Sequence, residues 1–255
     1  MILALALASA TVAPPPPPQA LWEAWPRRRF VEAPAACLRH ADLLSGLAAL
    51  AAKHPGRARI EEIGRSAEGR AIQLLAFGTG PRHILLWSQM HGDEPSATPA
   101  LLDAADYLLS EPQGAAVLQE LTLLVVPMLN PDGTERGARR NAQGIDINRD
   151  ARDLATPEGR LLKRLRDEWQ PTIGFNLHNQ HPLTTVGKSR NQATISLLAV
   201  SGNPEGKFSP EGERNKRLSA VMVRALENFI KGNIARYEDD YMPTAFGDRM
   251  SEWGT

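Results

Sequence analysis

The chain has 255 residues, of which 42% are hydrophobic and 23% are charged, as is typical of a folded globular domain and not of a disordered or fibrous chain. Its 29 basic and 29 acidic residues cancel, so the basic surface that nucleic-acid binding requires is not indicated and we expect no nucleic-acid partner. Cys37 is the only cysteine, which excludes an intrachain disulfide and leaves imidazole and carboxylate as the ligands of any metal site.

The N-terminus resembles an export signal followed by a spacer. Residues 1–10 form an apolar run that ends in Ala8-Ser9-Ala10, an A-x-A cleavage pattern. The run lacks a positively charged n-region, and the alternative is a buried or frayed N-terminal segment. It is also shorter than the roughly 20 residues of a membrane span, so no transmembrane segment is expected. Pro14–Pro18 favours an extended spacer. We therefore expect a signal peptide and proline-rich linker at 1–20, a folded domain at 21–255, and a secreted or periplasmic protein.

The rest of the chain alternates between helical and strand patterns. In chain order, these patterns predict a helix at Leu38–Lys53, strands at Arg59–Ile63, Ala71–Phe77 and Ile84–Trp87, a helix at Ala97–Leu109, a strand at Leu121–Met128, a helix at Leu161–Trp169, strands at Thr172–Leu177 and Ala193–Val200, and a helix at Arg214–Lys231. Gly202–Gly212 is predicted to be a loop. The alternation predicts an α/β fold with a mixed, mostly parallel central sheet and helices on both faces. Ligands of such sheets bind at the carboxyl ends of the strands.

The first candidate site follows the strand Ile84–Trp87. His91 and Glu94 stand three residues apart on a turn opened by Gly92, and this spacing can direct an imidazole and a carboxylate to one point. Two histidines and a glutamate would leave a fourth zinc position for water. The alternative is a polar turn that leads into a helix, where an acidic residue is stabilised by the helix dipole.

Two further polar clusters follow predicted strands. Asn130-Pro131-Asp132-Gly133 comes after Leu121–Met128 and is typical of a turn. The segment 139–149 ends in Asn148 and Arg149, an amide and a guanidinium that suit a carboxylate ligand, although a solvated basic loop with a short edge strand is the alternative. The third cluster, 175–181, contains two histidines, and His178 is favoured over His181 as a ligand by its place at the strand end.

Together these motifs resemble the zinc carboxypeptidase family (carboxypeptidase A/B-like metallopeptidases, or funnelins). The resemblance runs from about residue 38 to the end of the chain. It rests on His91-x-x-Glu94, Asn130-Pro131-Asp132-Gly133, Gly144-Ile145-Asp146-Ile147-Asn148-Arg149 and His178, with Ile60 to Arg70 resembling the family's opening strand and turn.

The resemblance implies one Zn²⁺ per chain, held by His91, Glu94 and His178. It implies that Arg139 stabilises the oxyanion, with Arg140 as the less favoured choice. It implies that Asn148 and Arg149 bind the terminal carboxylate of a peptide substrate. A zinc ion lowers the pKa of its bound water to roughly 7 and polarises the scissile carbonyl, and Arg139 would add positive charge where the oxyanion develops.

The C-terminus limits what the resemblance implies. The family's general-base glutamate lies on a strand after a Trp-Gly-Thr-like segment, and the sequence ends at Trp253-Gly254-Thr255. We therefore expect a C-terminally truncated chain whose glutamate falls just beyond Thr255, with Glu252 a poor substitute. Tyr237 and Tyr241 are candidates for the family's substrate-capping tyrosine, and packing at a loop rim is their alternative role.

The expected function is a zinc metallocarboxypeptidase, which hydrolyses the C-terminal peptide bond of peptides through a zinc-activated water. An amidohydrolase of N-acyl amino acids, similar to aspartoacylase and succinylglutamate desuccinylase, is the neighbouring alternative. Asn130–Gly133 and the expected export signal favour the peptidase. A non-catalytic zinc- and carboxylate-binding module is the third possibility, which the missing glutamate supports.

Overall fold

The computed structural model describes residue 23 and residues 38–255. The predicted signal peptide and linker at 1–20 therefore lie outside the described residues. The described elements are α2 (His40–Lys53), β1 (Ala58–Arg65), β2 (Ala71–Phe77), β3 (Arg82–Ser88), α3 (Ala97–Ser110), α4 (Pro112–Glu120), β4 (Leu121–Val126), α5 (Pro131–Arg136), the 3₁₀ helix η3 (Ile147–Arg149), α6 (Pro157–Trp169), β5 (Ile173–Leu177), β6 (Ile195–Leu197), α7 (Pro210–Ile230), β7 (Ile234–Arg236) and α8 (Phe246–Glu252).

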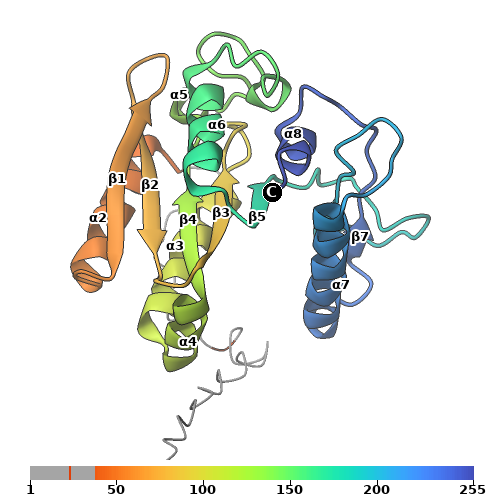
Figure 1. Cartoon of the computed structure of the whole chain (residues 1–255), viewed down its shortest axis with the longest axis horizontal. Helices are drawn as coiled ribbons and strands as arrows, with labels where there is room; N and C mark the ends of the chain where they lie inside the picture. Colours follow the sequence, from red (N-terminus) through yellow and green to blue (C-terminus); the bar gives the residue numbers. More distant parts are fainter. Residues whose placement is uncertain (1–22, 24–37) are drawn as a thin grey trace, which may run out of the picture.

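A five-stranded mixed sheet in the order β1-β2-β4-β3-β5 forms the centre of the fold (Figure 1). Strands β4, β3 and β5 run parallel, and the hairpin of β1 and β2 adds antiparallel pairs. The mixed α/β fold predicted from the sequence is thus confirmed. Because β3, β4 and β5 run parallel, the loops that follow them lie at one edge of the sheet.

Side chains alternate between the two faces of the sheet, and each face has its own helices. On one face, strand residues such as Leu74 and Trp87 pack against α6 and α8. On the other face, residues such as Leu75 and Val125 pack against α2, α3 and α4. Because side chains alternate along each strand and helices cover both faces, apolar side chains are buried on both faces of the sheet, as predicted.

Several local predictions differ from the structure. Asn130–Gly133 is not an isolated turn, because Asn130 caps helix α5 by accepting the Gly133 N–H at 2.8 Å. The short edge strand that was the alternative for the end of segment 139–149 is not formed, and Ile147–Arg149 is the 3₁₀ helix η3. Helix α4 was not predicted, since only Gly114 and Leu118 of it are buried and the apolar stripe is weak. Helix α3 begins at Ala97, so Glu94 lies on the preceding turn and not in a helix.

The C-terminal part of the described chain buries fewer of its side chains than the central sheet does. Strand β6 is shorter than predicted and pairs with β7 in a separate two-stranded sheet. Helix α7 lies beside this pair (Figure 1), and among its residues only Gly212 is buried. None of the helices in the described ranges is long and apolar enough to cross a membrane.

A buried glutamate anchors the loop that follows α5. Glu158, near the start of α6, is fully buried, and its Oε2 accepts the Asn141 Nδ2–H at 3.0 Å. Asn141 in turn accepts the main-chain N–H groups of Gln143 and Ile145. Burial raises the pKa of Glu158 above its ordinary value, against hydrogen bonds that lower it. The anchor holds the segment between Arg139 and Asp146 in a fixed shape.

Replacing this carboxyl by an amide should change how stability depends on pH. Because the folded state raises the pKa of Glu158, the wild type loses stability relative to Glu158→Gln as the pH rises from about 4 through the raised pKa. Urea unfolding between about pH 4 and about pH 8 measures the difference. Glu168→Gln, an exposed position on the same helix, should show no such trend. A pH-independent difference for Glu158→Gln would show that Glu158 is charged in the folded protein.

Candidate metal centre

The turn after β3 is held close to helix α5. Gln89 has a left-handed backbone with φ 46°, and its buried side chain bonds the Gly92 carbonyl at 3.3 Å and the Thr134 hydroxyl at 3.0 Å. A Cβ on Gly92 would lie 2.0 Å from the main-chain carbon of Gly133, so only glycine permits this approach. The turn consequently presents His91 and Glu94 at the carboxyl edge of the sheet.

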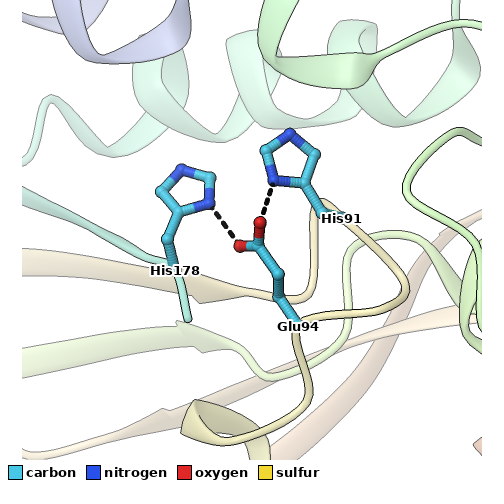
Figure 2. Close-up of side chains that lie close together, drawn as sticks. All are labelled: His91, Glu94 and His178. Carbon is cyan, nitrogen blue, oxygen red and sulfur yellow. Dashed lines mark hydrogen bonds and ion pairs between the residues drawn. The ribbon is translucent and has the colours of Figure 1, made fainter. Parts of the chain in front are cut away.

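Three predicted ligands meet at this edge. Glu94 lies between the two imidazoles, with its Oε1 2.9 Å from His91 Nδ1 and its Oε2 2.7 Å from His178 Nδ1 (Figure 2). The two rings are 4.7 Å apart between centroids. The side chain of His91 is 2% exposed and that of His178 is 31% exposed, so the cluster is buried on one side and open on the other.

Asp146 and Arg139 extend the hydrogen-bond network of the cluster: Asp146 contacts His91, and Arg139 contacts both Asp146 and Glu94. His91 Nε2 lies 3.0 Å from Asp146 Oδ1, and Arg139 Nε donates to Asp146 Oδ2 at 3.0 Å. Arg139 Nη1 lies 3.3 Å from Glu94 Oε1 and 3.1 Å from His91 Nδ1. Arg139 therefore reaches the atoms at which the three side chains converge.

The electrostatics follow from burial among opposite charges. Burial alone would raise the pKa of Glu94, but hydrogen bonds and charge interactions with His178 and His91 lower it to about 2. Burial is likewise outweighed at Asp146, where His91 and Arg139 lower the pKa. For His91, burial lowers the pKa, and the bonds to Asp146 and Glu94 outweigh it and raise the pKa. Both carboxylates are thus held in the charged form.

The donor set fits a zinc ion. The ligand atoms of His91, Glu94 and His178 lie within 4.8 Å of one another, and two imidazoles with one carboxylate are a common zinc set that leaves an open position. The carboxylate–imidazole contact of Asp146 with His91 Nε2 is the usual support of a ligating histidine, because it fixes the ring orientation. The described residues could therefore hold one zinc ion.

The remaining predicted site residues lie on η3, next to this cluster. The main-chain N–H of Asn148 donates to Asp146 Oδ1 at 2.9 Å, and the Asn148 Oδ1 accepts the Phe246 N–H at 3.1 Å. Arg149 is exposed, and its Nη1 donates to the Asn148 carbonyl at 2.7 Å. One guanidinium is thus accessible beside the cluster, while the Asn148 side-chain oxygen is engaged by α8.

Tyr241, Glu252 and His181 form hydrogen bonds outside the cluster, and Tyr237 is exposed. Tyr241 bonds Glu252, which also pairs with Arg249, and Tyr237 is 47% exposed. The Nδ1 of His181 accepts the Leu183 N–H at 3.2 Å within its own loop.

Sequence reasoning missed Asp146 and Asn179 as residues of the site. The main-chain N–H of Asn179 donates to Glu94 Oε2 at 3.2 Å. The position of Asp146 within a polar motif and that of Asn179 directly after His178 were the available signals.

Comparison with known proteins gives one family. A sequence model described as zinc carboxypeptidase matches residues 43–172, about half of the chain. The catalytic chain of carboxypeptidase N from Homo sapiens is 30% identical over 46% of this chain and 31% of its own length. Carboxypeptidase Z from Homo sapiens is 32% identical over 42% of this chain and 20% of its own length. The chain thus spans about a third or less of the length of these relatives.

Solved structures agree on the fold. A metallo-carboxypeptidase from Burkholderia cenocepacia matches 84% of this chain and 56% of its own with a TM-score of 0.62 at 21% identity. Carboxypeptidase A from Helicoverpa armigera matches 92% of this chain and 68% of its own with a TM-score of 0.66 at 16% identity. At these identities the likeness establishes the architecture alone.

Removing the support of His91 should weaken metal binding without abolishing it. Asp146→Ala leaves all three candidate ligands in place but no longer orients the His91 ring, so zinc affinity should fall about 10- to 100-fold. Competition with a zinc-binding dye measures the affinity. Asp153→Ala, which removes an exposed carboxylate paired with Arg152, is the matched control and should bind zinc as the wild type does. Equal affinities for both variants would exclude a supporting role of Asp146.

Proposed function

Because the chain belongs to the zinc carboxypeptidase family, we propose that it is the zinc-binding part of a metallocarboxypeptidase that removes the C-terminal residue of peptides. The proposal is carried by the convergence of His91 Nδ1 and His178 Nδ1 on the Glu94 carboxylate, from loops that follow two neighbouring parallel strands. This arrangement offers three ligands and leaves one side open to solvent and substrate.

The three ligands would hold one zinc ion, with Asp146 orienting His91. A zinc ion bound there would supply a Lewis acid that polarises the scissile carbonyl and lowers the pKa of water. Arg139, anchored through its Nε on Asp146, directs its Nη1 to the same region and would stabilise negative charge that develops on the carbonyl oxygen. Each of these groups already forms hydrogen bonds with another group of the site.

Arg149 and Asn148 would bind the terminal carboxylate of the peptide. The exposed guanidinium of Arg149 is a bidentate donor for a carboxylate. The Asn148 side chain can add an N–H donor while its Oδ1 remains bonded to Phe246. Substrates with a free C-terminus are therefore the class that this site suits, and the carboxypeptidase relatives favour this over cleavage of N-acyl amino acids.

Hydrolysis also needs a general base that takes a proton from the attacking water. None of the described residues of the site is assigned to this role. Glu252 is paired with Arg249 and Tyr241 on and beside α8, which supports the expectation that it is not the general base. That role is left unassigned among the described residues, and the proposal includes export directed by residues 1–20.

Loss of one imidazole should remove the metal. His178→Ala leaves only His91 and Glu94, so the purified protein should no longer retain one zinc ion per chain after dialysis, as measured by elemental analysis. His181→Ala is the matched control, because His181 lies three residues away in an exposed loop and bonds Leu183. Zinc loss in His181→Ala, or full retention in His178→Ala, would contradict the assigned ligand set.

Loss of Arg149 should weaken the binding of free carboxylates. In the zinc-loaded protein, Arg149→Ala should raise the Kd of a non-hydrolysable tripeptide analogue about tenfold or more, because it removes charge-assisted hydrogen bonds. The amidated analogue should bind equally to both proteins. Isothermal titration calorimetry measures the four constants. Arg152→Ala, an exposed arginine three residues along the chain, is the matched control, and an unchanged Kd in Arg149→Ala would overturn the carboxypeptidase assignment.

A further inference from the structure

A pocket of about 420 Å³ lies directly beside the candidate metal centre. Its lining includes Gly92, Asp93 and Pro95, which flank Glu94 in the chain, and Asn179, which follows His178. Helix α5 and the segment before α2 complete the lining. None of the described residues that line it comes from η3 or α8. The pocket is therefore separate from the Asn148–Arg149 side of the centre.

The two sides of His91 define a direction across the site. His91 Nε2 faces Asp146 and, through it, η3, whereas His91 Nδ1 faces Glu94. A peptide whose terminal carboxylate is bound at Arg149 and whose scissile carbonyl lies at the ligand cluster must continue away from η3. The pocket is lined by residues on both sides of Glu94, which His91 Nδ1 faces, so we expect the residue or residues before the scissile bond to reach it.

Asp93 carries the unbalanced charge in this pocket. Its side chain is exposed, and no hydrogen bond or ion pair joins it to another residue of the described ranges. The other charged groups of the wall offset one another in sign: Arg136 pairs with Glu68, which lies outside the lining. The Arg39 guanidinium, which donates to the carbonyls of Thr134 and Glu135, offsets the Glu135 carboxylate, which accepts the His40 N–H. The free carboxylate therefore sets the sign of the charge that the pocket favours.

We propose that Asp93 is a specificity-determining residue, which selects peptides with a positively charged side chain on the amino-terminal side of the bond to be cleaved. This inference rests on the proposed function, because the direction of the peptide follows from carboxylate binding at Arg149. The pocket volume accommodates the side chain of one residue, and a lysine ammonium or arginine guanidinium there meets a carboxylate without displacing an existing ion pair.

The test uses binding and not hydrolysis. The probes are acetylated tripeptide analogues of alanine in which a ketomethylene group replaces the last peptide bond, with lysine or glutamine at the first or the second position. Calorimetry on the zinc-loaded protein gives each Kd. At least one lysine probe should bind about threefold more tightly than its glutamine match, and the ratio should fall as salt is added.

Variants assign the preference to Asp93. Asp93→Asn should reduce the lysine-to-glutamine ratio to about one, and Asp93→Lys should invert it. Glu120→Gln, which removes a carboxylate on α4 that is paired with Arg82, should leave the ratio unchanged. A ratio of one in the wild type at both positions, or a preference that persists in Asp93→Asn, would overturn the proposal.

The amidated probes separate this proposal from the proposed function. If free-acid probes bind more tightly than amidated ones but lysine gives no advantage, the role of Asp93 fails and the carboxypeptidase function stands. If acid and amide bind equally, the direction of the peptide is lost and both proposals fail.

Discussion

The candidate centre depends on the parallel pairing of β3 with β5. In this pairing Trp87 lies opposite Asn176 and Ser88 lies opposite Leu177, so the two strands end at the same level and the loops that follow them start side by side. His91 and His178 are far apart in sequence, yet their separation in space is fixed by this register. A shift by one residue would turn the side chains of β5 to the opposite face, and His178 would no longer face Glu94.

A single carboxylate links the parts of the site that follow the strands. Asp146 accepts from the His91 ring, from Arg139 Nε and from the Asn148 main chain. These contacts join a candidate metal ligand, a candidate oxyanion-stabilising group and the loop that carries Arg149. The loop itself is fixed at its other end by the buried pair of Asn141 and Glu158. Burying a carboxylate without a hydrogen-bond partner costs free energy. Loss of a partner of Asp146 or Glu158 therefore lowers the stability of the fold.

The sequence predicts those features that local pattern determines. The strand Ala71–Phe77 was predicted with its observed limits, because its apolar residues serve both faces of the sheet. The cluster of His91, Glu94 and His178 was predicted from the resemblance and from the positions at strand ends. The role of Asp146 was not, since it depends on a contact with His91 across 55 positions of the chain. Strand β6 was predicted too long because its apolar run continues beyond the three residues that pair with β7.

The two ends of Arg139 have different roles in this arrangement. Its Nε is bonded to the carboxylate of Asp146, which is largely buried, and this bond fixes the base of the guanidinium. Its Nη1 lies 3.3 Å from Glu94 Oε1 and 3.1 Å from His91 Nδ1, both longer than the inner bond. The Arg139 side chain as a whole is 44% exposed, so the outer contacts exchange with water more easily than the inner one. Under the proposed function, an anionic oxygen beside Glu94 would meet a guanidinium that its inner bond to Asp146 already orients, so little reorganisation would be needed to stabilise its charge.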